Sequence, residues 1–297
     1  MMTVTSVRTV ADMLQGFSIE VMPRTAAKIP DFRAILPPGT RVYIAHIDGT
    51  PIGDMVATAR RLAQEGFAVM PHFPARSIRN RPELDDWIAR YQGEAGVHEA
   101  LVLAGGNATP IGDFHASMDL LKTEAFLAAG FDRLHVAGHP EGNRDIDPAG
   151  GTAGVDDALR WKARYAHDTG VEMAVVTQFL FDAETAVTWI AHLREAGIAL
   201  PVHLGIAGPA KLQTLLKFAI ACGVGPSLGV LKKRARDLSK LLLPFEPDDM
   251  VRALALKAQS DPDHAPAQVH FFPLGGIQTC ADWARRQSAG PLRQVVG

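Results

Sequence analysis

Short apolar runs alternate with helical stretches eight times along this chain, and this alternation limits the fold more than any other feature of the sequence. The runs are almost continuously apolar, as strands buried on both faces of a parallel sheet are. Eight strand–helix repeats predict an α/β protein built as a (β/α)8 TIM barrel. A doubly wound open sheet is the main alternative, because the sequence does not give the order of the strands. The runs lie at 17–22, 41–47, 67–73, 99–105, 133–139, 172–179, 201–207 and 268–274.

The segments between these runs have the apolar spacing of helices. A length of 297 residues suits one barrel, so we expect a single domain over 1–297. The segment 223–247 does not fit the repeat. We expect a lid or an extra helical segment there, with a basic face around 232–236 for which a solvated helix face is the alternative. The predicted helices lie at 54–66, 84–94, 114–130, 155–170, 182–197, 209–223 and 247–260, and five of them end on a glycine suited to the C′ position.

Charge and composition exclude several classes of partner. The formal net charge of −2 gives no general attraction to nucleic acid or to an anionic membrane. No apolar run reaches about 18 residues, so we expect no membrane span. The chain start lacks the basic-then-apolar pattern of a signal peptide. Cys222 and Cys280 have no C-x-x-C spacing, which argues against a disulfide or zinc scaffold and predicts a cytoplasmic protein.

Polar side chains gather where the predicted strands end, and in a barrel this edge carries the chemistry. In "HFPARSIRN", His72 is followed by Arg76 and Arg79. Singly, such residues are more often structural or solvated. Together they predict a site, because a purely structural rim has no need to converge in this way. The other strand-end residues are Glu20, His46, Asp48, Gly105, Gly106, Asn107, His139, Glu141, Asn143, Arg144, Thr177, Gln178, Gly205, Gly208, Gly275 and Gly276.

The types of residue at the strand ends limit the kinds of reaction that the site can carry out. There is no evident Ser-His-Asp set, P-loop or two-metal carboxylate cluster. A zinc site from His46, His72 and His139 is conceivable, but nothing in the spacing supports it, so we expect no metal. The glycines of "AGGNATP" can offer backbone N–H groups to a flat or anionic ligand. The set suits a bound organic cofactor that carries electrons, with Glu20 as the proton donor.

The segments "IEVMPRT", "ALVLAGGNATP", "AGHPEGN", "VVTQFLFD" and "LGIAGP", in this order, resemble the methylenetetrahydrofolate reductase family. The resemblance runs from about Ser18 to Gly223 and continues more weakly in "VHFFPLGG". It implies a (β/α)8 barrel that binds FAD at its C-terminal face and a tetrahydrofolate derivative as substrate. Members of the family pass a hydride from NAD(P)H, the co-substrate, to FAD. The hydride then passes to 5,10-methylenetetrahydrofolate, which becomes 5-methyltetrahydrofolate.

The resemblance gives three residues roles toward the folate. Glu20 stands where the family has its general acid, which protonates N10 as the five-membered ring opens. An ion pair of Glu20 with Arg24 is the structural alternative. Gln178 matches a glutamine that hydrogen-bonds the pterin, and a strand-end amide bonded to backbone is its alternative. Phe218 matches an aromatic against folate or nicotinamide, with an ordinary helix core residue as the alternative.

The resemblance also implies a set of FAD contacts. Either Lys162 or Arg164 would reach the pyrophosphate, because the alignment there is uncertain by one residue. We expect Arg76 and Arg79 to shape the rim, with a solvated loop as the alternative. The implied cofactor-binding residues are His46, His72, Gly105, Gly106, Asn107, His115, Ala116, His139, Asn143 and Lys162. Asn107 is also an expected substrate contact.

The chain departs from the family pattern at two strand ends. Where the family has Arg-Gly-Asp after the fourth strand, this chain has Gly105, Gly106 and Asn107, and Gly276 replaces an arginine after the eighth strand. Loss of a carboxylate beside the flavin favours the anionic reduced form, so we expect a bias toward oxidation of 5-methyltetrahydrofolate. A relative with another electron donor or methyl carrier, and a non-catalytic folate-binding or partner protein, are the alternatives. A homo-oligomer stays open, because the basic segment suits either a neighbouring subunit or a polyglutamate tail.

Overall fold

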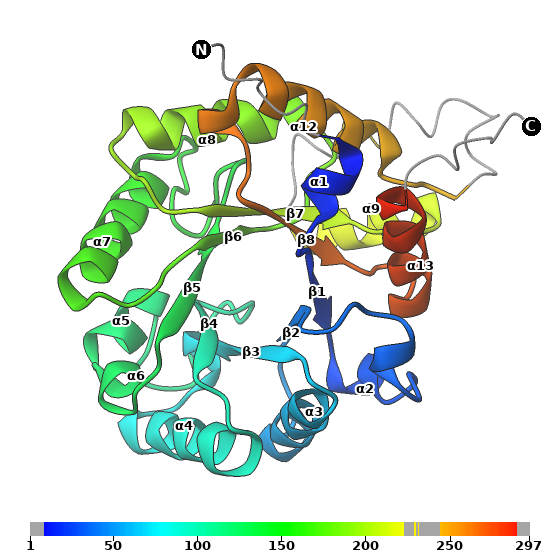
Figure 1. The fold of residues 1–297 in the computed structure, drawn as a ribbon. Helices are drawn as coiled ribbons and strands as arrows, with labels where there is room; N and C mark the ends of the chain where they lie inside the picture. Colours follow the sequence, from blue (N-terminus) through cyan, green and yellow to red (C-terminus); the bar gives the residue numbers. More distant parts are fainter. Residues whose placement is uncertain (1–8, 223–228, 230, 232–243, 290–297) are drawn as a thin grey trace, which may run out of the picture.

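The structure is a computed structural model that describes residues 9–222, 229, 231 and 244–289. Eight parallel strands close into one barrel in sequence order, with β8 paired to β1 (Figure 1). The predicted (β/α)8 barrel is therefore confirmed, and the open sheet is wrong. The strands are β1 (Ser18–Val21), β2 (Arg41–Ile44), β3 (Ala68–Pro74), β4 (Glu99–Leu103), β5 (Arg133–Gly138), β6 (Val175–Thr177), β7 (Val202–Ala207) and β8 (Gln268–Phe272).

Helices form the outer ring around this barrel (Figure 1). They are α1 (Val10–Leu14), α2 (Pro23–Ala26), α3 (Ile52–Gln64), α4 (Arg81–Ala95), α5 (Ser117–Lys122), α6 (Ala125–Ala128), α7 (Ala153–Thr169), α8 (Ala183–Glu195), α9 (Leu212–Ala221), α12 (Asp248–Ser260) and α13 (Ile277–Ser288). Three short 3-10 turns are η1 (Phe32–Ala34), η2 (Ala75–Ser77) and η3 (Pro262–His264).

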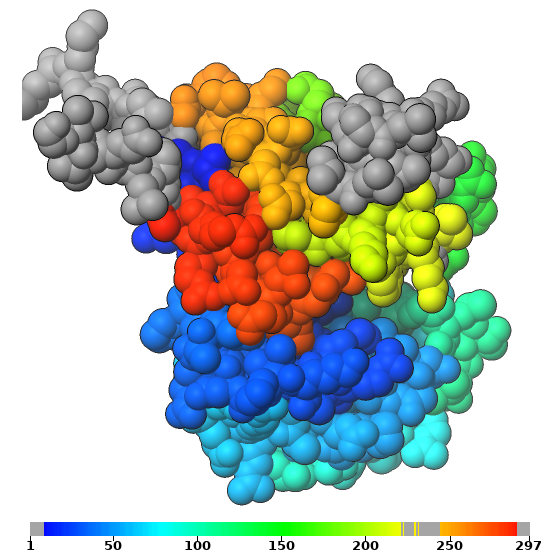
Figure 2. Space-filling view, turned by 90° about the vertical axis from the view of Figure 1, so that its right-hand side faces the viewer, coloured from blue at the N-terminus to red at the C-terminus, as the bar shows by residue number. Residues whose placement is uncertain are grey.

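The single helix predicted over 114–130 is wrong, because α5 and α6 divide that segment. The Oγ1 of Thr123 donates a hydrogen bond to the carbonyl of Leu120 at 2.6 Å, and Glu124 has a φ of 57°. A residue in the left-handed region cannot continue a right-handed helix. The short helices α1 and α2 and the 12-residue helix α13 add to the predicted set. The blue atoms of α1 lie beside the orange α12 and the red α13, and α1 contacts both helices (Figure 2).

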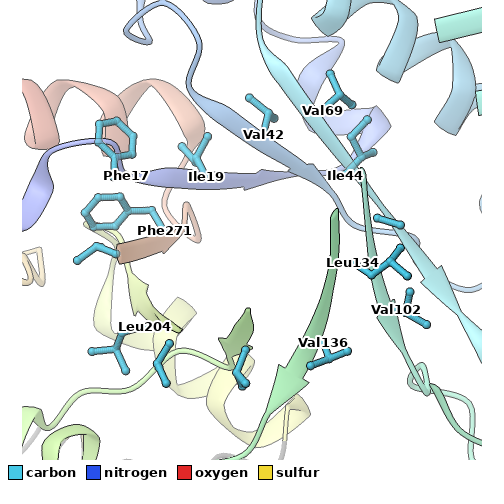
Figure 3. Close-up of a cluster of buried hydrophobic side chains, with 14 of the residues drawn as sticks. Phe17, Ile19, Val42, Ile44, Val69, Val102, Leu134, Val136, Leu204 and Phe271 are labelled. Atoms are coloured by element: carbon cyan, nitrogen blue, oxygen red, sulfur yellow. The ribbon is translucent and has the colours of Figure 1, made fainter. Parts of the chain in front are cut away.

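Side chains alternate along each strand, and the outward set builds the core between barrel and helices. On β2, Val42 and Ile44 point outward, and on β5 Leu134 and Val136 do the same; all four are fully buried. Figure 3 shows such side chains arranged around the ring of strands. This layer explains the nearly continuous apolar character of the strands, because the helices cover the outer face of the barrel completely.

The inward set is unusually polar for the interior of such a barrel, where branched apolar residues dominate. Met70, Leu101 and Val176 form only a small apolar cluster with Tyr43 inside the barrel. The remaining inward side chains include a hydroxyl and four buried imidazoles. They are Ser18, His72, His135, His203 and His270.

Most of the predicted lid at 223–247, including its basic stretch at 232–236, lies outside the described residues. Within the described part, Phe245 forms an isolated antiparallel bridge with Ala210, and both side chains belong to an apolar cluster under α9. Among the helices that the structure describes, none is both long enough and apolar enough to cross a membrane.

Candidate active site at the C-terminal end of the barrel

Glu20 projects inward near the C-terminal end of β1, where two imidazoles converge on its carboxylate. The Nε2 of His72 lies 3.4 Å from Glu20 Oε2, and the Nε2 of His270 lies 4.0 Å from the same oxygen. No ion pair with Arg24 occurs in the described part of the chain, so the structural alternative for Glu20 is wrong. The Glu20 side chain keeps 20% of its surface exposed, so a ligand above the strand ends can reach it.

His270 is fully buried, and its two ring nitrogens face different partners. Nδ1 lies 3.0 Å from the hydroxyl of Ser18, and Nε2 has no hydrogen-bond partner among the described residues. Burial, with smaller contributions from His72 and His203, holds the pKa of His270 well below its usual value. A neutral imidazole beside Glu20 places no positive charge there, so it does not oppose protonation of the carboxyl.

A second polar chain runs from this cluster toward the opposite end of the barrel. The Tyr43 ring packs edge-on to His270, with centroids 4.5 Å apart, and its hydroxyl lies 2.6 Å from Nδ1 of His135. Burial raises the pKa of Tyr43, so its hydroxyl stays protonated, and the tautomer of His135 decides which of the two groups donates. His135 in turn packs edge-on to His203, with ring centroids 4.8 Å apart.

Asn107 lies in the loop between β4 and α5, and Arg76, in the loop after β3, binds this loop at two points. Arg76 Nη1 donates to the Asn107 carbonyl at 3.0 Å, and Arg76 Nε donates to the His115 carbonyl at 3.0 Å. The amide Nδ2 of Asn107 lies 3.3 Å from Asp48 Oδ1, so a carboxylate from the β2 loop stands beside the expected site of the lost one. Arg76 is thus a loop anchor, whereas Arg79 is exposed and pairs with Glu83 within its own helix turn.

His139, Asn143 and Lys162 come together at the end of β5. Asn143 Nδ2 lies 3.4 Å from His139 Nδ1, and Lys162 lowers the pKa of His139 in addition to the larger effect of burial, to about 4. Lys162 is buried on α7 without a hydrogen bond or ion pair to a described residue, and burial lowers its pKa to about 8. Arg164 is exposed, so Lys162 is the cation that faces inward.

His46 lies beyond the end of β2 on the face of Trp87, with ring centroids 4.9 Å apart and an angle of 22° between the planes. Its Nε2 lies 3.1 Å from the Thr50 carbonyl, while Nδ1 is buried without a partner in the described chain. Burial lowers the pKa of His46. His46 therefore presents a neutral ring whose orientation is fixed by stacking.

The glycines after β4 and the start of α5 provide backbone rather than side-chain groups. Gly105 has a φ of 93°, and a Cβ at this position would lie 2.9 Å from Pro74 Cβ. Gly106 faces open space, so its backbone is accessible to a ligand. At the first turn of α5, the backbone N–H groups of His115 and Ala116 both donate to Asp119, at 2.9 and 3.0 Å. In this arrangement those two N–H groups are already satisfied.

Gln178 and Phe218 keep local contacts that resemble their structural alternatives. The Oε1 of Gln178 accepts a hydrogen bond from the Phe179 N–H at 3.1 Å. Phe218 is half-buried on α9 and packs on the apolar cluster that contains Phe179 and Phe245. Within the described part of the chain, neither residue forms a hydrogen bond or a ring contact with the Glu20 cluster, although both stand at the same end of the barrel.

Large apolar side chains are exposed on three of the loops around this mouth. Ile47 follows β2, Ile111 follows β4 and Ile146 follows β5, and each keeps at least 41% of its surface exposed. Exposed apolar groups that surround polar ones are typical of sites for flat, partly apolar ligands. Groups of three or more His, Cys, Asp or Glu side chains that could hold a metal ion are absent from the residues that the structure describes.

The sequence does not predict the barrel-interior residues Tyr43, His135, His203 and His270 as part of the polar site. Their strands are nearly continuous apolar runs, and the prediction takes polar groups from the strand ends alone. The alternation of side chains along a strand indicates them. On β8, for example, Gln268, His270 and Phe272 lie on one face, and Val269 and Phe271 lie on the other.

No protein-family model matches this chain. Its barrel superposes on a Clostridium thermocellum protein that binds two copies of 5-methyl-5,6,7,8-tetrahydrofolic acid, with a TM-score of 0.56 and 11% identity. The match covers 92% of this chain and 96% of that one. A mannotriose complex of a Thermomonospora fusca β-mannanase matches with a TM-score of 0.45 and 13% identity over 88% of this chain and 78% of that one. At these identities the matches show a shared fold alone.

Proposed function

We propose that this chain is an FAD-dependent oxidoreductase of the methylenetetrahydrofolate reductase type, which interconverts 5,10-methylenetetrahydrofolate and 5-methyltetrahydrofolate. The observation that carries this proposal is the Glu20 carboxyl, half-buried between the Nε2 atoms of His72 and His270 at the catalytic end of the barrel. The motif order quoted above supports it. A protein of the same fold that binds 5-methyltetrahydrofolate supports the folate part of the proposal.

The residues at the strand ends fit an FAD. Lys162 is a buried cation without a partner in the described chain, and an anionic pyrophosphate would provide one. The neutral rings of His46 and His139 and the accessible backbone of Gly106 offer hydrogen bonds and flat surfaces beside it. The exposed Ile47, Ile111 and Ile146 would cover the apolar parts of the ligands.

A bound flavin would, in its reduced form, donate the hydride that the folate carbon gains and, in its oxidised form, accept the hydride that this carbon loses. The role of Glu20 is to hold the proton that moves to N10 when the five-membered ring opens, and to take that proton back in the reverse direction. His270 lies beside the carboxyl without adding positive charge. A tightly fitting folate above Glu20 would exclude water from the carboxyl.

The expected bias toward 5-methyltetrahydrofolate oxidation depends on Asp48 as well as on Asn107. Asp48 brings a carboxylate to 3.3 Å from the amide of Asn107, so the negative charge lost from one strand end is partly restored from another. We therefore propose reversible interconversion, with NAD(P)H as the external hydride donor in the reductive direction.

A non-catalytic folate-binding protein is the second candidate. It is favoured by the replacement of two expected arginines by Gly105 and Gly276, and by the local hydrogen bond of Gln178 to the Phe179 N–H. Such a protein would bind 5-methyltetrahydrofolate without a flavin. The colour of the purified protein separates the two candidates.

The test is an anaerobic visible spectrum of the purified protein, mixed in turn with NADH, NADPH and 5-methyltetrahydrofolate. We expect a flavin band that 5-methyltetrahydrofolate bleaches. The Glu20→Gln variant should keep the band and its bleaching by the nicotinamide, but lose bleaching by the folate. A colourless protein that still binds 5-methyltetrahydrofolate would support the second candidate. A yellow protein that no donor bleaches would overturn the proposed reaction.

A further inference from the structure

A cavity of about 560 Å³ opens at the N-terminal end of the barrel, opposite the candidate active site. Arg41, Arg133 and Gln268 are the first residues of β2, β5 and β8, and their side chains line it. In barrels of this kind the N-terminal end usually serves stability and is filled by packed side chains. A polar hollow of this size at that end therefore calls for another explanation.

Two buried imidazoles, His135 and His203, line the inner part of this cavity. His203 is 9% exposed, and neither of its ring nitrogens has a hydrogen-bond partner among the described residues; its Nδ1 is fully buried. After burial itself, Arg41 and Arg133 are the causes that lower the pKa of His203, to about 4. The imidazoles in the inner part of the cavity are thus neutral, and Arg41 and Arg133 are the cations that act on His203.

The two arginines have donors left over for a ligand. Arg41 binds Glu99 through Nε at 2.7 Å and Nη2 at 3.0 Å, so its Nη1 has no partner in the described chain. Arg133 binds Glu99 through Nη1 and Glu172 through Nη2, which leaves its Nε without one. Two guanidinium edges and the His203 ring together suit a carboxylate.

The outer part of the cavity has the opposite charge. The Glu172 side chain is 67% exposed, against 27% for Arg133 and 18% for Arg41, so its carboxylate lies nearest to solvent. Glu172 uses Oε2 on Arg133, and its Oε1 has no partner among the described residues. Exposed carboxylate oxygens at the mouth suit a positively charged group on the ligand.

The four charges of this cluster cancel, because Arg41 and Arg133 stand against Glu99 and Glu172. A ligand with a net charge would leave the cluster unbalanced in a partly desolvated site, whereas a ligand with both charges would not. We propose that this cavity binds a zwitterionic α-amino acid, with its carboxylate toward Arg41, Arg133 and His203 and its ammonium group toward Glu172. Its side chain would lie on the apolar wall formed by Met173, Ala174, Pro201 and Ala267.

This site is independent of the proposed reaction. None of its lining residues touches the Glu20 carboxylate, and the reaction at the other end uses neither arginine. Binding measurements therefore test this proposal separately from the proposed reaction with flavin and folate.

The experiment is a titration of the full chain with each standard L-amino acid. Calorimetry measures the binding, and the imidazole NMR signals of ¹³C-histidine-labelled protein report where it occurs. His203→Gln assigns the signal of His203. For each amino acid that binds, the matched probes are its amide, which lacks the carboxylate, and its deaminated acid, which lacks the ammonium group. We expect one or more amino acids to bind with a Kd on the order of 1 mM or tighter and to shift the His203 signal.

The Glu172→Gln variant should weaken that binding at least tenfold, and Glu184→Gln is its control. Glu184 has a similar exposure, 65%, and also pairs with a basic side chain, Lys257, but it lies outside the cavity lining. Equal binding of the deaminated acid would overturn the zwitterion proposal in favour of a simple anion site. The proposed site would be overturned if no amino acid binds at concentrations on the order of 10 mM. It would also be overturned if an amino acid binds without shifting the imidazole signal of His203.

Discussion

The amide nitrogen of Asn107 lies 3.3 Å from a carboxylate oxygen of Asp48, so the loops after β4 and β2 share one negative charge at the mouth of the barrel. Neither residue indicates this pairing by its position in the sequence. The charge beside the proposed flavin site is therefore a property of the pair and not of Asn107 alone.

This pair predicts opposite shifts of the flavin midpoint potential. Asp48→Asn should raise the potential by tens of millivolts, since loss of a nearby negative charge favours the reduced flavin; 30 mV corresponds to about 1.4 kcal/mol for a two-electron couple. Asn107→Asp should lower the flavin midpoint potential, because the new carboxylate adds a second negative charge beside that of Asp48. The double exchange Asp48→Asn/Asn107→Asp should restore a potential near that of the natural protein. Spectroelectrochemistry checks this, and an unchanged potential in Asp48→Asn would contradict the shared-charge interpretation.

Glu20→Gln should lower turnover in both directions by about 10²–10⁴-fold, the range expected for loss of a general acid. The isosteric amide cannot donate a proton to N10 but keeps the side-chain volume. Binding of 5-methyltetrahydrofolate and the thermal midpoint should change little. Single-turnover kinetics with separate folate-binding measurements check this. A variant that retains full folate turnover would remove Glu20 from the proposed role.

Lys162 predicts a dependence of stability on pH. Its pKa falls from 10.5 to about 8 on folding, so the unfolded chain binds more protons between these values and stability rises with pH across that window. A shift of this size corresponds to about 3 kcal/mol. Lys162→Met should remove the rise and stabilise the flavin-free protein at pH 7, while FAD affinity falls. Urea unfolding at pH 7 and near pH 10 tests the first part, and a variant that is less stable than the natural protein at pH 7 would contradict it.

Tyr43→Phe should destabilise the barrel by about 1–3 kcal/mol, because it leaves His135 Nδ1 buried without a partner. Tyr91→Phe is the matched control. Tyr91 is equally buried, but its hydroxyl has no hydrogen-bond partner in the described structure, so its removal should be neutral or stabilising. Urea unfolding of both variants gives the comparison. Equal losses of stability would mean that the Tyr43–His135 hydrogen bond contributes nothing specific.

The position of the candidate site could be predicted from the sequence, because local chain geometry places strand ends at one edge of a barrel. Glu20, His72, Asn107 and His139 all stand at this edge, and their functional roles stay predictions. The partners were not predictable, since Glu20 meets His270 across a separation of 250 residues, and only barrel closure brings β1 beside β8. The helix break at Glu124 was missed for another reason: one residue with positive φ leaves the apolar period intact.

The sequence by itself determined the eight-fold strand–helix alternation and the buried parallel sheet, because buried parallel strands and their covering helices each leave a local pattern of apolar residues. Closure of the sheet into a barrel was decided by the tertiary structure, which pairs β8 with β1. Only the tertiary structure decided which polar groups face one another. It paired Asn107 with Asp48, set His72 and His270 against Glu20, and left Lys162 without a partner among the described residues. Periodicity fixes which face a side chain takes, whereas hydrogen bonds and desolvation depend on distances between residues far apart in the chain.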